Sequence, residues 1–164
     1  MFQSLSINLN DALRYFPLVF LAGITGLPST AQETTFNVES IGLNQNGELL
    51  LQFPTEESYY YRLMRGPTAV VQDSVVDAIL GDSESGKLID PSIAEYKRAF
   101  YVIDKIALDQ AIDSDNDGID DVFELQHPSI LNPANPADAA YDFDLDTVSN
   151  FDEYIDGTDL STSS

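Results

Sequence analysis

Residues 113 to 124 read DSDNDGIDDVFE and gather six acidic side chains around one glycine. Carboxylates this close together repel one another, so they need either full solvation or a positive charge between them. Asp113, Asp115 and Asp117 stand on alternate residues, and Gly118 follows them directly. In a loop that wraps around a cation, carboxylates on alternate residues converge on one centre. The segment therefore predicts a metal-binding loop, and the alternative is an acidic loop that is simply solvated.

The spacing of the first loop suits calcium. Ca²⁺ takes about six to eight oxygen ligands, and the pattern D-x-[DN]-x-[DN]-G-x₅-E supplies them in twelve residues. Glycine stands at position 6, where the chain turns sharply, a backbone carbonyl is offered at position 7, and a glutamate closes the site at position 12. The ligands expected in this loop, directly or through water at position 9, are Asp113, Asp115, Asp117, Ile119, Asp121 and Glu124.

A second copy of the pattern, DFDLDTVSNFDE, begins at Asp142. Thr147 stands at position 6, where a left-handed backbone costs a β-branched residue about 1–2 kcal/mol. We therefore expect one or two bound Ca²⁺ ions, with the first site the tighter. The ligands expected in the second loop are Asp142, Asp144, Asp146, Val148, Asn150 and Glu153.

Each loop runs into a short predicted helix, and the second helix ends at Gly157, a normal C-terminal signal. His127, the single histidine, lies next to Pro128 at the end of the first helix, and we interpret it as a surface or capping residue. The small core expected for this part pairs Ile119 with Val148, and Phe123 with Phe151 and Tyr154.

Charge separates this part from the rest of the chain. Residues 109 to 164 contain fifteen acidic side chains and no lysine or arginine, whereas residues 32 to 108 contain twelve acidic and six basic ones. The net charge of −21 argues against nucleic acid or anionic membranes as partners and favours cations or basic protein surfaces. No cysteine is present, which excludes disulfides and thiolate metal sites.

The N-terminus has the features of a signal peptide. Residues 15 to 27 form an apolar run that is too short to span a bilayer comfortably. Ser29 and Ala31 then place small residues where a signal peptidase prefers them. We expect residues 1 to 31 to be removed, leaving a secreted, extracellular or surface protein without a membrane insertion. A buried N-terminal helix or an uncleaved anchor is the alternative.

Residues 32 to 108 predict about five or six short strands and hence a small antiparallel sandwich. Asn46-Gly47 between two apolar runs predicts a hairpin. Residues 81 to 92 are rich in turn formers and are expected to be a loop. From residue 99 the pattern alternates, which places Tyr101 and Ile103 on the opposite face from Phe100 and Val102.

The sequence of residues 32 to 108 contains no catalytic motif. It contains no cysteine, histidine or glycine-rich phosphate loop, and no nucleophile–base pair, so we expect no enzyme activity. Tyr59, Tyr60 and Tyr61 alternate between the two faces of a strand. We interpret them as strand packing, with an aromatic platform for a polysaccharide as the alternative.

The segments DSDNDGIDDVFEL and NPANPADAAYDFDLDTVSNFDEYIDGTD resemble the paired calcium loops at the ends of many secreted bacterial proteins. Such pairs are described as thrombospondin type 3 repeat-like and are related in loop chemistry to EF-hands and dockerins. The resemblance covers residues 109 to 160 and implies Ca²⁺ at the two ligand sets. The sequence departs from that of EF-hand sensors at position 8, where Asp120 and Ser149 replace an apolar residue. It also lacks the long helices that lead into EF-hand loops.

We therefore expect a mainly β, sandwich-like domain at residues 32–108, a small α, EF-hand-like calcium-loop module at 109–160 and a tail at 161–164. The expected function is that of a secreted calcium-binding structural or adhesive protein whose loop pair is folded by Ca²⁺. The alternatives are a dockerin-like module that binds a receptor domain of another extracellular protein, and a carbohydrate-binding sandwich.

Overall fold

The computed structural model describes residues 5–8, 22–23 and 37–163. The chain divides into two compact units, Met1–Ala107 and Leu108–Ser164. The predicted signal peptide lies outside the described residues apart from two short strands, and its cleavage site after Ala31 lies outside them altogether, so both stay predictions. In the described ranges no helix has the length and apolar character needed to cross a membrane.

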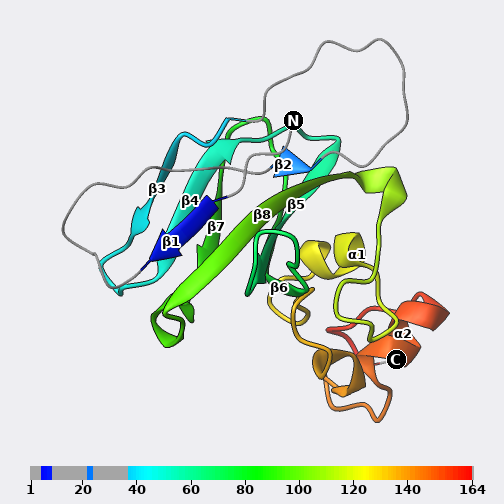
Figure 1. The fold of residues 1–164 in the computed structure, drawn as a ribbon. Helices are drawn as coiled ribbons and strands as arrows, with labels where there is room; N and C mark the ends of the chain where they lie inside the picture. Colours follow the sequence, from blue (N-terminus) through cyan, green and yellow to red (C-terminus); the bar gives the residue numbers. More distant parts are fainter. Residues whose placement is uncertain (1–4, 9–21, 24–36, 164) are drawn as a thin grey trace. The chain divides into compact units, whose positions relative to one another are not determined.

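The longest strands of the first unit form one antiparallel sheet. It contains β5 (Tyr59–Gly66), β6 (Ser74–Leu80) and β8 (Arg98–Ala107), with β5 in the middle (Figure 1). Two further short strands pair with β8: β1 (Leu5–Asn8) runs antiparallel to it and β2 (Ala22–Gly23) runs parallel to it. Tyr, Val and Ile are frequent in the three long strands, as expected for side chains that pack well on a pleated surface.

A second antiparallel sheet contains β3 (Ser40–Leu43), β4 (Leu49–Pro54) and β7 (Ser85–Asp90). The β3–β4 connection is the hairpin that Asn46-Gly47 predicts. Gly47 has a φ of +81° and donates its N–H to the carbonyl of Asn44 at 3.0 Å. A turn followed by a left-handed glycine is a common solution for a short hairpin loop, so this prediction is confirmed.

The core of the first unit contains side chains from both sheets. The predicted alternation in β8 is confirmed, because Tyr101 and Ile103 belong to this core cluster whereas Phe100 and Val102 do not. The short 3₁₀ helix η2 (Ile93–Glu95) adds Ile93. The buried members of the cluster are Leu49, Leu51, Phe53, Tyr61, Leu63, Leu88, Ile93, Ala99, Tyr101 and Ile103.

The expected loop at residues 81 to 92 is wrong, because β7 occupies its middle and pairs with β4. Glycine, proline and aspartate normally mark turns, and they hid an alternating pattern in which Gly86, Leu88 and Asp90 are buried. Gly86 is needed for packing: a Cβ there would lie 2.5 Å from Thr55 Cγ2 and 2.6 Å from Ile79 Cδ1. Tertiary contacts of Gly86 and Asp90 therefore override their local turn preference.

The tyrosines of β5 serve packing. Tyr60 and Tyr61 are buried, and the Tyr61 ring lies 5.1 Å from that of Phe53, centroid to centroid. Tyr59 is half-buried, with Lys105 Nζ 4.0 Å from its ring centroid. Since Tyr60 and Tyr61 are covered, an exposed platform for a sugar would have to be built without them.

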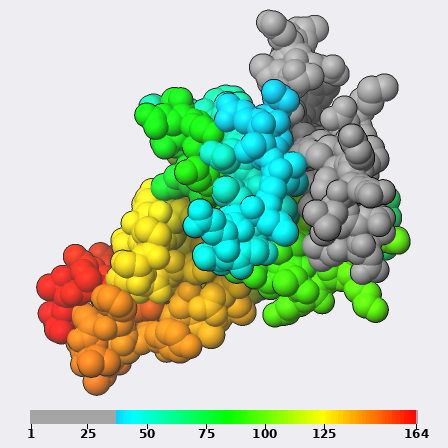
Figure 2. Space-filling model, turned by 90° about the vertical axis from the view of Figure 1, so that its left-hand side faces the viewer, coloured from blue at the N-terminus to red at the C-terminus, as the bar shows by residue number. Residues whose placement is uncertain are grey.

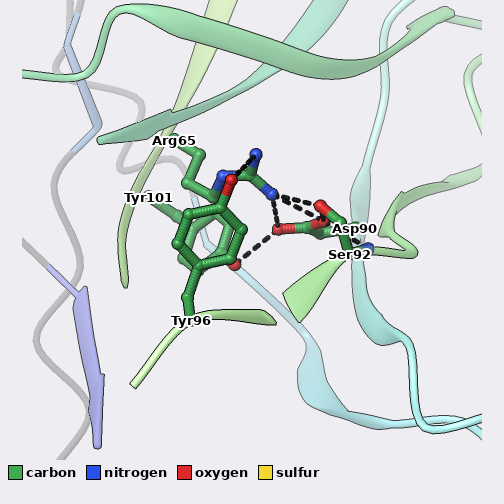
Figure 3. A network of polar contacts seen from close by, with 5 residues as sticks. All are labelled: Arg65, Asp90, Ser92, Tyr96 and Tyr101. Atoms are coloured by element: carbon green, nitrogen blue, oxygen red, sulfur yellow. Dashed lines mark hydrogen bonds and ion pairs between the residues drawn. The ribbon is translucent and has the colours of Figure 1, made fainter. Parts of the chain in front are cut away.

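A buried ion pair joins β5 to β7 in this unit (Figure 3). Asp90 is fully buried, and both of its oxygens accept from Arg65 Nη1, at 2.8 and 2.9 Å. The Tyr101 hydroxyl donates to Asp90 at 2.7 Å, and Ser92 donates both its N–H and its hydroxyl. Burial raises the pKa of a carboxyl, but these donors outweigh it and hold the pKa of Asp90 below its usual value. Asp90 is therefore a buried carboxylate whose charge is fully compensated.

The second unit contains little regular secondary structure and consists of two loop-and-helix segments. It begins with the 3₁₀ helix η3 (Leu108–Gln110), so no long helix enters the first loop. Helix α1 (Asp121–Gln126) follows the first loop, η4 (Asp138–Ala140) lies in the connection, and α2 (Asn150–Asp156) follows the second loop. Gly157 caps α2 with a φ of +70°, as expected from the sequence. The chain thus consists of an N-terminal β region of two antiparallel sheets followed by a short helical part.

The core of this second unit is larger than the sequence suggests. Ile119 is fully buried, as expected, but Val148 is only half-buried and stands outside the cluster. His127 caps α1, with its Nδ1 2.8 Å from the carbonyl oxygen of Phe123. The cluster consists of buried Ile119, Leu131, Ala139 and Leu160, with Phe123, Ile130, Phe151 and Tyr154 packed against it.

Candidate metal centre

The first acidic loop folds back on its first aspartate. Asp113 accepts hydrogen bonds from the N–H groups of Asn116 at 2.7 Å and Gly118 at 3.0 Å. Asp117 accepts from the N–H of Ile119 at 2.9 Å. This wrapping brings one carboxylate oxygen each from Asp113, Asp115 and Asp117 within 4.8 Å of one another. Three of the predicted ligands are therefore gathered in one place.

Glu124 and an aspartate outside the pattern extend this cluster. Glu124 lies on α1 and is fully buried, and Asp138 lies on η4 and is 3% exposed. One oxygen from each lies within 4.8 Å of an oxygen of Asp117. The backbone N–H of Asn132 donates to Asp138 Oδ2 at 2.9 Å and orients its carboxylate. Sequence reasoning missed Asp138, which stands 14 residues beyond Glu124 in the connecting segment and belongs to no spacing rule of the loop.

The carboxylate at position 9, Asp121, is held inside the loop by Ser114, and its expected role as a calcium ligand stays a prediction. Asp121 is buried, and its two oxygens accept from the N–H of Ser114 at 2.8 Å and from the Ser114 hydroxyl at 2.5 Å. It therefore holds the loop closed from inside. Asp138, rather than Asp121, is grouped with Asp117 and Glu124.

Several oxygens of this cluster are buried without any hydrogen-bond donor. Asp90 in the β region shows the usual solution for a buried carboxylate, with donors for both oxygens. Glu124 is equally buried, yet neither of its oxygens has a partner. Burying an uncompensated charge costs several kcal/mol per ion, and removing the partner of a buried charge destabilises a protein by about 3–5 kcal/mol. Six oxygens in this cluster are buried without a hydrogen-bond partner: both of Asp115, Oδ2 of Asp117, both of Glu124 and Oδ1 of Asp138.

The electrostatics of the cluster disfavour the ionised forms of Glu124 and Asp115. Burial raises the pKa of Glu124 to about 9, and the carboxylates of Asp115, Asp117 and Asp138 add to this effect. Burial and the neighbouring Asp117 raise the pKa of Asp115 to about 6. A divalent cation between these groups reverses the effect, because it favours their charged forms.

The second loop repeats several of the hydrogen bonds of the first. Asp142 accepts from the N–H groups of Thr147 at 2.8 Å and Asp146 at 3.1 Å, and Asp146 accepts from Val148 at 2.9 Å. One oxygen each of Asp142, Asp144 and Asp146 lies within 4.8 Å of the other two. The two loops thus have the same local construction.

The closing residues of the second loop are also buried and partly unpaired. Glu153 is fully buried, and Asn150 is 1% exposed. Burial raises the pKa of Glu153, with Asp144 and Asp146 adding to it. Four buried oxygens around this loop have no hydrogen-bond partner: Asp144 Oδ2, Asn150 Oδ1 and both oxygens of Glu153. The second cluster therefore offers fewer such atoms than the first.

Position 8 of each loop has a capping role that explains the departure from EF-hand sensors. Asp120 accepts from the N–H of Phe123 at 3.0 Å and caps α1, and Ser149 accepts from the N–H of Asp152 at 3.1 Å and caps α2. An N-cap satisfies a backbone donor that a short helix leaves unpaired. A polar residue at position 8 thus starts the helix that carries the position-12 glutamate.

Position 6 is left-handed in both loops. Gly118 has a φ of +99° and Thr147 a φ of +83°, so the sharp turn expected there is confirmed. A Cβ on Gly118 would lie 2.5 Å from Phe151 Cε2. The first loop therefore needs glycine for both conformation and packing, whereas the second contains a strained threonine.

Replacing Thr147 with glycine should tighten the second site. The swap removes about 1–2 kcal/mol of left-handed strain, which corresponds to roughly a 5- to 30-fold gain in calcium affinity if the strain is relieved only in the bound loop. Calorimetric titration of the T147G variant measures this gain. The control is Gly118→Ala, which adds strain and a clash with Phe151 and should weaken the first site. An unchanged affinity for T147G would show that the loop has the same strain with and without an ion.

Comparison with protein-family models, with curated proteins and with solved structures found no match to this chain. Its function must therefore be inferred from its own residues.

Proposed function

We propose that the second unit is an EF-hand-like module that binds two Ca²⁺ ions, one in each loop, and that the first unit is a β-sandwich. The observation that carries this proposal is the state of Glu124 and Glu153. Both stand at position 12 of equivalent loops, both are fully buried, and neither has a hydrogen-bond partner on either oxygen. A buried glutamate at position 12 with aspartates near it, able to offer both oxygens to an ion, is what each of two calcium sites requires.

The ligand chemistry favours calcium over other metals. The gathered side chains offer oxygen alone, which suits hard cations rather than zinc or copper. The six unpaired oxygens of the first cluster, with the backbone carbonyl expected from Ile119, fall in the range of about six to eight ligands that Ca²⁺ takes. Mg²⁺ prefers a smaller octahedral site and keeps several waters, so a buried carboxylate cage suits it less well.

In this proposal calcium has a structural role in a secreted, non-enzymatic protein that acts in adhesion or as a surface component. Fifteen acidic residues and no basic ones beyond residue 108 would repel one another strongly without the ions. The buried acids whose oxygens lack a hydrogen-bond partner are metal ligands in this proposal rather than catalytic groups. The predicted signal peptide supports a location where calcium is abundant.

Calorimetric titration with calcium tests the proposal. The chain should bind two ions with dissociation constants of about 10⁻⁴–10⁻³ M, the range of extracellular modules, and the first loop should be tighter. Glu124→Gln and Glu153→Gln should each remove one ion. Asp156→Asn is the matched control, since Asp156 is exposed on α2 and belongs to neither cluster. If E124Q and E153Q bind as much calcium as D156N, the buried glutamates are not ligands.

Docking to another extracellular protein is a second candidate function, favoured by the outer surface of the second loop. Its aspartates alternate with exposed apolar side chains: Tyr141, Phe143 and Leu145 are 60%, 51% and 83% exposed. The orange segment that contains this loop is part of the surface in Figure 2. An exposed apolar group on an acidic unit suits a partner with an apolar patch and a basic rim. Co-purification of such a partner only in calcium, and its loss in a Phe143→Ser variant, would support docking.

A further inference from the structure

One hydrogen bond joins the two proposed sites directly. The side-chain amide of Asn150 donates from Nδ2 to the main-chain carbonyl of Asp138 at 2.8 Å, and both residues are buried. Asp138 belongs to the first cluster through its carboxylate, whose Oδ1 has no hydrogen-bond partner. Asn150 stands at position 9 of the second loop, and its Oδ1 is also buried without a partner. Each proposed site therefore contributes one residue to this hydrogen bond, Asp138 from the first and Asn150 from the second.

We propose that this bond couples the two sites, so that calcium in one loop raises the affinity of the other. The proposal rests on the proposed function, since it requires that both loops bind calcium. An ion in the first site fixes the Asp138 carboxylate, which also accepts from the N–H of Asn132 at 2.9 Å and from Asn135 Nδ2 at 3.2 Å. The short η4 turn, and with it the Asp138 carbonyl, is then held in place.

Fixing the Asp138 carbonyl orders the asparagine in the second loop. Because Nδ2 donates to that carbonyl, the amide has one orientation, and its oxygen is the atom left for the second ion. Ordering a ligand before its ion binds lowers the entropic cost of the second binding step. Linkage then requires that an ion in the second loop raises the affinity of the first by the same factor.

The Asn150→Asp variant removes the hydrogen bond to Asp138 without removing the ligand oxygen at position 9. The variant keeps an oxygen for the ion at position 9 but loses the donor to Asp138. In the wild-type chain we expect a coupling factor above 1, measured as the ratio of the first loop's calcium affinity in the wild-type chain to its affinity in E153Q, which removes the second ion. In N150D both ions should still bind, but in independent steps, and the coupling factor should fall by about 5-fold or more, the lower end of typical couplings. Circular dichroism at saturating calcium checks that N150D is folded.

Tyr154→Phe is the matched control. The Tyr154 hydroxyl donates to Asp120 at 2.9 Å and forms another link between α2 and the first loop, but it touches neither ligand set. Y154F should keep the wild-type coupling factor. The coupling proposal is overturned if N150D keeps the wild-type coupling factor or if Y154F loses it equally, since general packing would then carry the effect. Equal calcium affinity of the first loop in the wild-type chain and in E153Q, which removes the second ion, also overturns it, whereas a chain that binds no calcium overturns the proposed function.

Discussion

Removal of calcium should unfold the second unit and leave the β region nearly unchanged. The buried glutamates at position 12 would face clusters of like charge, and the core around Ile119 and Leu131 is small. A ligand that binds only the folded state adds about 2.7 kcal/mol of stability at a hundredfold excess over its dissociation constant, so two ions add about 5 kcal/mol. This is a large share of the stability of a unit of this size.

Amide hydrogen exchange measures this effect residue by residue. In chelator, exchange should become fast from about residue 109 onward, while the strands around Leu49–Phe53 and Phe100–Ile103 stay protected. The boundary predicted between residues 108 and 109 is tested by the same data. Loss of protection in both parts together would show one cooperative unit, and no change in either part would show that the acids are not organised around an ion.

Loss of Arg65 should destabilise the β region by about 3–5 kcal/mol, because it leaves the carboxylate of Asp90 buried without its counter-ion. Asp90 is fully buried, and Arg65 contacts both of its oxygens. Urea unfolding of Arg65→Ala, followed by tyrosine fluorescence, gives the size of the loss. Arg62→Ala is the matched control on the same strand. Its partner Asp104 has a side chain that is 29% exposed, so water can replace much of the lost ion pair.

The cause of this loss can be checked with a second substitution. Asp90→Asn removes the buried charge, so R65A combined with D90N should be less destabilised than R65A alone. If the double variant is no more stable than R65A, the role of Arg65 lies in packing, including its contact with the Tyr96 ring at 4.1 Å.

The local features of the two loops could be predicted from the sequence because their causes are local. Carboxylates at fixed spacings, the left-handed turn at Gly118 and Thr147, and the short helices that follow are all set within twelve residues. The hairpin at Asn46-Gly47 is another feature of this kind. Each depends on backbone preferences that act over a few bonds.

The remaining features depend on contacts between distant residues. Asp138 joins the first cluster because the connection folds back over it, and no spacing rule contains that information. Asp121 matches the pattern, but its carboxylate is held by Ser114, which only the folded loop shows. Strand β7 was hidden because Gly86 and Asp90 have tertiary partners that outweigh their turn preference.

If the buried, unpaired carboxylates are calcium ligands, anomalous diffraction from crystals grown with calcium should show two peaks. One should lie about 2.3–2.6 Å from oxygens of Glu124, Asp117 and Asp138, and the other at the same distance from oxygens of Glu153 and Asp144. Crystals with no anomalous peak at either cluster, in which these carboxyls are paired with one another or turned to solvent, would contradict it.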